Sequence, residues 1–93
     1  MKKLNKQDLA EVLHAKLGGT KVSADLAVET LIEFITDSLK RGDEVSLAGL
    51  GIFSVKRREA RDARNPRTGE TIRVQAMNVP KFRAAKALKD SVK

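Results

Sequence analysis

The sequence has no cysteine, tryptophan or tyrosine, and its aromatic residues are limited to three phenylalanines. Without cysteine the chain can form neither a disulfide nor a thiolate metal site. It has no apolar run long enough to cross a membrane, and the polar residues that follow Leu4 are unlike a signal peptide. A chain of this size buries only about 60% of its unfolded surface. We therefore expect an intracellular protein that is stabilised by association with a second copy.

Side chains suited to catalysis are equally scarce. His14 is the single histidine, and no cysteine is present to act as a nucleophile. Gly49-Leu50-Gly51 lacks the extended glycine pattern and the following lysine of a phosphate-binding loop. The sequence therefore predicts no enzymatic activity, no cofactor and no metal site, and it places His14 on the surface or partly packed.

Charge is distributed unevenly along the chain. Residues 1–55 carry seven Lys and Arg against eight Asp and Glu, a net charge of −1, whereas residues 56–93 carry twelve against four, a net charge of +8. A near-neutral part followed by a strongly basic part is typical of a scaffold that carries a polyanion-binding element. The alternative is a solvated basic face that only keeps the protein soluble.

Helical periodicity marks the first part of the chain. Asn5 is a candidate N-cap, apolar residues then repeat at helical spacing, and Gly18-Gly19 ends the run. Ser23 is a second candidate N-cap, and the apolar stripe that follows it ends at Gly42. These signals predict a two-helix hairpin over residues 1–43, whose apolar faces cannot close a core alone.

Apolar and polar residues alternate with a period of two from Glu44, with a tight turn at Gly49-Leu50-Gly51. A later strand is expected to contain Ile72, Val74 and Ala76 and to be stopped by Pro80. We predict an α+β fold in one domain, residues 1–93. It comprises the two-helix N-terminal hairpin, a three-stranded antiparallel sheet with a long β-ribbon arm (residues 44–80), and a short C-terminal helix over residues 81–93 that includes Phe82.

The arm, about residues 56–72, has nothing substantial to bury. Between Val55 and Ile72 its only apolar side chains besides Pro66 are two alanines. The segment Asn65-Pro66-Arg67-Thr68-Gly69 nevertheless has strong turn chemistry. It predicts a two-stranded ribbon that folds back at Pro66 and projects from the body, because nine extended residues span about 30 Å.

Six arginines and one lysine in and beside this ribbon match a rod of phosphates. Duplex DNA carries one charge about every 1.7 Å, and arginine gains from the negative potential of the minor groove. Pro66 is rigid, apolar and without an N–H, as a wedge between base steps requires; the alternative is an ordinary turn proline. A disordered basic arm that binds RNA or protein is a further alternative, which the central turn disfavours.

The segment Gly49-Leu50-Gly51-Ile52-Phe53-Ser54-Val55, then Arg61, then Arg64-Asn65-Pro66-Arg67-Thr68-Gly69, resembles the signature of the bacterial HU/IHF family of DNA-bending proteins. The resemblance extends from Leu4 to Lys93, and the C-terminal segment is closer to HU than to IHF. It implies an intertwined dimer whose two arms embrace the DNA minor groove, with Pro66 intercalated. It further implies a cytoplasmic, histone-like protein of the bacterial nucleoid that binds and bends duplex DNA with low sequence specificity and contributes to its compaction.

The resemblance also assigns individual residues. Those assigned to DNA binding are Lys6, Lys56, Arg58, Arg61, Arg64, Asn65, Pro66, Arg67, Arg73 and Lys86. Those assigned to the dimer core are Leu31, Phe34, Ile35, Leu47, Leu50, Phe53 and Phe82. We expect a homodimer, with a heterodimer of related chains as the alternative, and a preference for nicked or distorted DNA is left open.

The chain departs from the family pattern at a few positions. Leu50 stands where phenylalanine is usual, and Asp62-Ala63 replaces a small polar residue and glycine. An acid beside phosphate is expected to lower DNA affinity, and alanine restricts the backbone more than glycine. Two other functions fit the same residues: a sequence-specific IHF-like factor, and a basic module whose arms grip RNA or an acidic protein.

Overall fold

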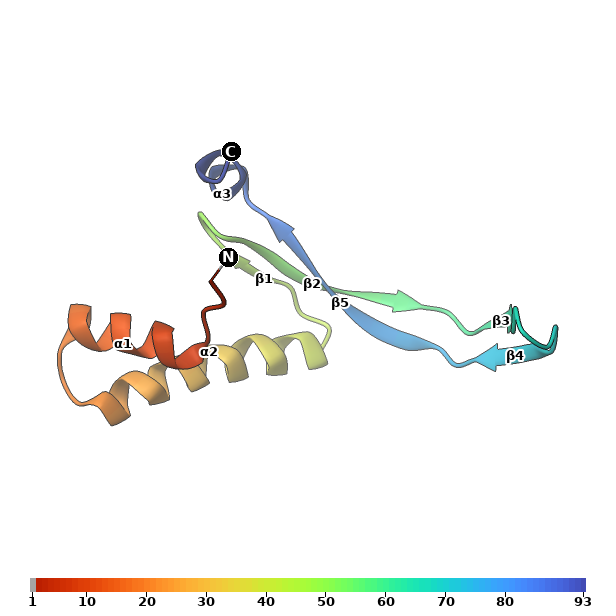
Figure 1. Cartoon of the computed structure of the whole chain (residues 1–93), viewed down its shortest axis with the longest axis horizontal. Helices are drawn as coiled ribbons and strands as arrows, with labels where there is room; N and C mark the ends of the chain where they lie inside the picture. The colour runs from red at the N-terminus through yellow and green to blue at the C-terminus, as the bar shows by residue number, and fades with distance from the viewer. Residues whose placement is uncertain (1) are drawn as a thin grey trace. The chain divides into compact units, whose positions relative to one another are not determined.

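The computed structural model describes residues 2–93, which form two compact units, the residues up to Asp37 and residues Ser38–Lys93. The elements in chain order are α1 (Lys6–Leu17), α2 (Lys21–Lys40), β1 (Val45–Leu47), β2 (Gly51–Arg58), β3 (Arg61–Arg64), β4 (Thr71–Val74), β5 (Met77–Ala84) and α3 (Lys86–Ser91) (Figure 1). The predicted α+β class is confirmed, with a helical hairpin, an antiparallel sheet, a β-ribbon arm and a short C-terminal helix.

Local capping sets where the two long helices begin. The Asn5 side chain accepts a hydrogen bond from the backbone N–H of Asp8 at 3.1 Å, and the Asn5 N–H donates to the Asp8 carboxylate at 2.8 Å, which is the predicted N-cap in a reciprocal box. The prediction of Ser23 as the second cap is wrong. α2 begins at Lys21, and the backbone N–H of Ser23 donates to the Thr20 hydroxyl at 3.0 Å, so Thr20 occupies the capping position.

The helices of the first unit pack through small residues. Ala10 of α1 and Ala24 and Val28 of α2 are buried together, and Leu13 packs against them. Larger apolar side chains of α2 remain outside this contact, since Leu31 is 44% and Phe34 57% exposed. The hairpin therefore leaves an apolar face uncovered in the single chain.

The sheet of the second unit has the strand order β1-β2-β5 and is antiparallel throughout. Paired residues on neighbouring strands point to the same face of a sheet, and successive residues of one strand point to opposite faces. By this rule, the residues that share one face of this sheet are mostly apolar. Phe53 and Phe82 lie against each other on this face as a tilted pair, with ring centroids 4.8 Å apart. Gly51 leaves room for this contact, because a Cβ at Gly51 would lie 2.7 Å from the Phe82 ring. The apolar face comprises Val45, Leu47, Phe53, Val55, Pro80, Phe82 and Ala84.

The predicted C-terminal helix over residues 81–93 is wrong in its first half. Strand β5 runs through Pro80 to Ala84, and α3 covers only Lys86–Ser91. Pro80 does not stop the strand because β5 lies at the edge of the sheet, where a strand needs backbone hydrogen bonds on one side only. Phe82 is consequently a strand residue opposite Phe53.

The ribbon arm consists of two ladders in one continuous register. The β2–β5 ladder ends at the pair Arg58 and Met77, and the β3–β4 ladder resumes at Arg61 and Val74. Two residues on each strand, 59–60 and 75–76, lie unpaired between them, so the expected strand through Ala76 is interrupted there. In Figure 1, β3 and β4 continue outward from β2 and β5 as a two-stranded projection. Since β1 pairs only as far as Phe53, the two-stranded part begins at Ser54, slightly before the predicted arm.

Candidate nucleic-acid interface

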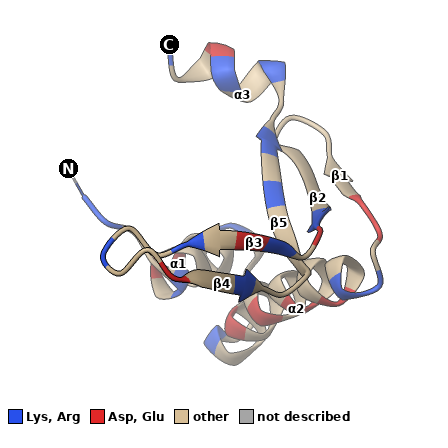
Figure 2. Cartoon of the chain, turned by 90° about the vertical axis from the view of Figure 1, so that its right-hand side faces the viewer, with Lys and Arg blue, Asp and Glu red and all other residues tan. Residues whose placement is uncertain are grey.

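The face of the sheet opposite the phenylalanines carries four cations. Lys56 and Arg58 of β2 share this face with Lys81 and Arg83 of β5, because Arg83 pairs with Ile52 and Lys81 with Ser54. All four side chains are exposed, and none takes part in an ion pair with another described residue. We call Lys56, Arg58, Lys81 and Arg83 the cationic sheet face. The basic positions on β5, β3 and β4 are blue in Figure 2.

The arm ends in a tight turn whose apex is Pro66. The Asn65 side-chain oxygen accepts a hydrogen bond from the Arg67 N–H at 2.9 Å, and the Asn65 carbonyl accepts one from the Gly69 N–H at 2.8 Å. The Asn65 N–H donates in turn to the carbonyl of Glu70 at 2.8 Å, which closes the loop. Gly69 has a φ of 77°, which favours glycine. The predicted turn is thus present, with Pro66 exposed and Asn65 fixing the loop.

The arm ladder separates its side chains into two faces. Arg61 lies with Ala63, Ile72 and Val74 on one face, and Arg64 lies with Asp62, Thr71 and Arg73 on the other. Arg58, Arg61, Arg64 and Arg67 have no ion-pair partner among residues 2–93. The guanidinium groups of those four predicted residues are therefore available to an external anion.

Two other arginines of the arm are already paired with carboxylates. The Arg73 guanidinium donates to Asp62 at 3.2 Å across the strands, and Arg57 donates to Glu59 at 3.1 Å. Figure 2 shows the acid in β3 as a red segment between basic ends. Arg73, a predicted contact, is thus not an unpaired cation in the free arm.

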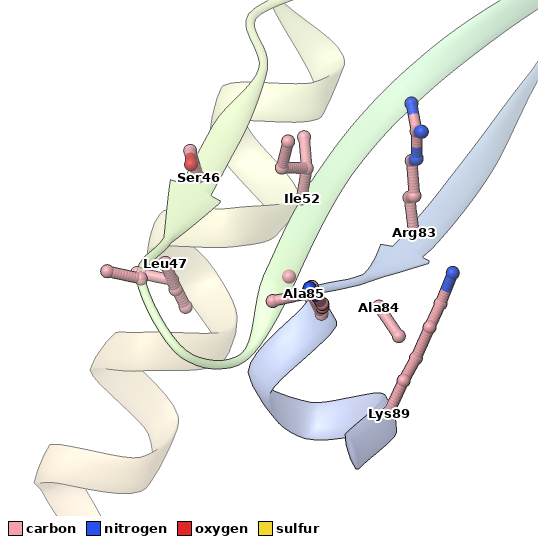
Figure 3. A pocket seen from close by; sticks show the side chains of 10 residues that line it. Ser46, Leu47, Ile52, Arg83, Ala84, Ala85 and Lys89 are labelled. Atoms are coloured by element: carbon pink, nitrogen blue, oxygen red, sulfur yellow. The ribbon is translucent and has the colours of Figure 1, made fainter.

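Three cations gather where β5 meets α3. Arg83, Lys86 and Lys89 line a cavity of about 360 Å³, together with Ala84, Ala85 and residues of the β1–β2 hairpin. Figure 3 shows the Arg83 and Lys89 side chains extending on the same side of β5 and α3. The predicted residue Lys86 therefore belongs to a larger basic cluster.

Lys6 belongs to the first compact unit. Its ammonium group is 2.7 Å from a carboxylate oxygen of Glu29, and this ion pair links α1 to α2. Lys6 is thus ion-paired within the helical hairpin, and the DNA contact that the resemblance assigns to it stays a prediction.

Sequence reasoning missed Lys81, Arg83 and Lys89. The predicted helix over residues 81–93 contains all three, and in a helix Lys81 and Arg83 do not share a sheet face with Lys56. A signal was present, because Pro80, Phe82 and Ala84 alternate with Lys81 and Arg83 as in a half-covered strand. The prediction gave Pro80 too much weight as a strand terminator.

His14, the single histidine, belongs to α1. His14 is partly buried, and its Nε2 lies 3.0 Å from the carbonyl oxygen of Gly19 in the loop that follows α1. Within residues 2–93, no three His, Asp or Glu side chains gather as a metal site. In the same part of the chain, every helix is too short or too polar to cross a bilayer.

The fold and its basic surfaces define a small α+β protein that presents cations on a sheet face and along a two-stranded arm. A family model described as bacterial DNA-binding protein matches residues 4–93, and the chain belongs to this family. DNA-binding protein HU-alpha of Aeromonas hydrophila is 49% identical over 90 residues, covering 97% of this chain and 100% of the relative. DNA-binding protein HU-beta of Salmonella typhimurium is 48% identical over 89 residues, covering 96% and 99%.

A solved structure extends the comparison to three dimensions. The Anabaena HU–DNA cocrystal structure matches with a TM-score of 0.83 and 36% identity, covering 96% of this chain and 97% of that one. The predicted kinship with HU proteins is confirmed. The family is defined by DNA binding rather than by a reaction, in agreement with the prediction of a protein that is not an enzyme.

Proposed function

We propose that this chain is a histone-like architectural protein that binds duplex DNA with low sequence specificity and bends it. The observation that carries this proposal is the run of exposed cations from the cationic sheet face to the arm, where Arg58, Arg61, Arg64 and Arg67 have no carboxylate partner among the described residues. The relatives named as DNA-binding HU proteins, and the Anabaena HU crystallised with DNA, support it.

In the proposed mechanism, phosphate contacts supply most of the affinity. Each Lys or Arg that neutralises a phosphate releases condensed counterions, so binding weakens as salt rises. Arginine side chains of the arm that reach into a minor groove would meet an enhanced negative potential there. Pro66 stands exposed at the apex, and we assign to it the wedge that opens a base step and bends the duplex.

We further propose that the functional unit is a homodimer. Among residues 2–93, only Ala10, Ala24, Val28 and Val45 are buried hydrophobics, and no side chain is less than 2% exposed. So small a core cannot stabilise a domain of this length. The predicted dimer-core residues instead expose apolar surface: Leu31, Phe34, Leu50 and Phe82 are each at least 40% exposed, and Ile35, Leu47 and Phe53 are only half-buried. A second copy that covers these residues would complete the core.

The test combines DNA binding with sizing of the free protein. We expect a dimer by light scattering after size-exclusion chromatography, and binding to random duplexes that weakens steeply between about 50 and 200 mM salt. Comparison of intact with nicked duplexes decides whether distorted DNA is preferred. Monomeric protein, or affinity for duplex DNA that does not depend on salt, would contradict the proposal.

The same assay separates the two alternative functions. Strong preference for one defined sequence over random duplex would indicate an IHF-like factor. Equal or tighter binding of RNA or heparin at matched salt would indicate a general basic module. For the cell, we propose a location on the cytoplasmic nucleoid, to be tested by imaging a fluorescent fusion against stained chromosomal DNA.

A further inference from the structure

The basic arm holds an acidic residue at its centre. Asp62 of β3 lies directly opposite Arg73 of β4, and its carboxylate accepts a hydrogen bond from the Arg73 guanidinium at 3.2 Å. Both side chains are more than 60% exposed, so an external phosphate can reach the same guanidinium. The ion pair therefore lies within the surface that is proposed to contact DNA.

The position of this pair lets it order the arm when DNA is absent. A two-stranded ribbon alone is marginally stable in water, and opposite charges placed directly across two strands stabilise it, whereas like charges destabilise it. Arg64 lies on the same face as Arg73 and diagonally across from it. The carboxylate of Asp62, beside one arginine and opposite the other, reduces the repulsion between them.

We propose that Asp62 is an internal competitor for the DNA phosphate at Arg73, which orders the free arm and lowers its affinity for DNA. This inference rests on the proposed DNA-binding function and adds a residue that tunes it. The proposal is based on two observations: Asp62 and Arg73 are in contact across the strands, and both side chains are exposed to solvent.

A DNA phosphate can bind the Arg73 guanidinium in two ways. Each of them carries a cost that weakens the protein–DNA complex. A guanidinium has five N–H donors, so a phosphate can approach while Asp62 keeps its hydrogen bond. The carboxylate and the phosphate then lie close together and repel each other. If the phosphate displaces Asp62 instead, the arm loses its cross-strand ion pair. The second ion pair of the ribbon, Arg57 with Glu59, does not bridge two strands and cannot couple arm order to DNA affinity in this way.

The test is a double-mutant cycle on the full chain with a random-sequence duplex. It compares the parent, Asp62→Asn, Arg73→Gln and the double variant, with affinity measured by fluorescence anisotropy across a salt series. Glu70→Gln is the charge-matched control, because Glu70 is an arm carboxylate without an ion-pair partner among the described residues. Amide hydrogen exchange of residues 61–64 and 71–74 in the free protein reports the order of the arm.

We expect Asp62→Asn to tighten binding about threefold for each arm that contacts the duplex, and to steepen the log–log salt slope by about 0.9 per arm. In the Arg73→Gln background this gain disappears, whereas any effect of Glu70→Gln is the same with and without Arg73→Gln. Exchange of the arm amides becomes faster in free Asp62→Asn.

Three results would overturn the proposal. An equal gain from Asp62→Asn with and without Arg73 would mean that Asp62 repels DNA directly. An unchanged affinity would mean that it does not compete, and unchanged amide exchange would mean that it does not order the arm. Failure of the proposed function is distinguishable from these, because the parent protein itself would then not bind duplex DNA.

Discussion

The rings of Phe53 and Phe82 lie opposite each other across β2 and β5, with their centroids 4.8 Å apart and their planes inclined by 47°. The contact places two bulky side chains on one face of a sheet whose other face is basic. Gly51 lies against the Phe82 ring, because a Cβ at this position would be 2.7 Å from two of its carbons.

We expect Gly51→Ala to destabilise the protein by about 1–3 kcal/mol, because the new Cβ would overlap the Phe82 ring and the carbonyl oxygen of Arg83. Urea unfolding followed by circular dichroism measures the change. Ser46→Ala, on the opposite face of the neighbouring strand, is the control and should stay within about 0.5 kcal/mol of the parent. Equal stability of Gly51→Ala and the parent would contradict the packing of Phe82.

Arg64→Ala should weaken binding to all duplex sequences several-fold and flatten the log–log salt slope by about 0.9 for each phosphate that the variant no longer neutralises. Arg61→Ala is expected to act in the same direction. Thr71→Ala is the matched control, because Thr71 pairs with Arg64 on the same face but carries no charge. A salt slope identical to that of the parent would mean that Arg64 does not bind phosphate.

Lys81→Ala should likewise reduce affinity and salt dependence, since Lys81 shares the cationic sheet face with Lys56 and Arg58. Lys40→Ala removes the same charge from the end of α2 and serves as the control for net charge. If both variants lose affinity equally, the sheet face has no specific part in binding.

Pro66→Ala should reduce DNA bending, and any preference for nicked duplexes, more than it reduces affinity for intact duplex. The turn itself should persist, because its hydrogen bonds come from Asn65, Arg67 and Gly69. Energy transfer between dyes at the two ends of a short duplex measures the bend. Pro80→Ala, at the only other proline, is the comparison, and an unchanged bend in Pro66→Ala would exclude the wedge.

Much of this fold could be predicted because its local signals are unambiguous. The cap at Asn5, the glycines after α1, and the turn at Asn65-Pro66 each specify a backbone geometry within a few residues. The C-terminal part could not be predicted in the same way. Whether Pro80 ends a strand depends on whether that strand is at an edge, and strand order is a tertiary property.

Part of the candidate site could likewise be predicted from local sequence, and part of it depends on strand pairing. The arginine-rich arm was evident from its composition, because no core could accommodate it. The basic residues Lys81 and Arg83 became visible only through the register with β2, which brings residues nearly thirty positions apart onto one face. The partner of Arg73 was hidden for the same reason, since only the pairing of β3 with β4 sets Asp62 opposite it.

The equal spacing of the unpaired residues on the two strands constrains how this arm can change in length. Two residues separate the ladders on the outgoing strand and two on the returning strand, so every side chain beyond the interruption keeps its face. Inserting a single residue into one strand only would reverse that strand's faces relative to its neighbour and move Arg64 to the side now held by Ala63. The arm can therefore keep both its pairing and its faces only if it lengthens or shortens by two residues on each strand together, because one residue on each strand would turn every outer side chain to the opposite face.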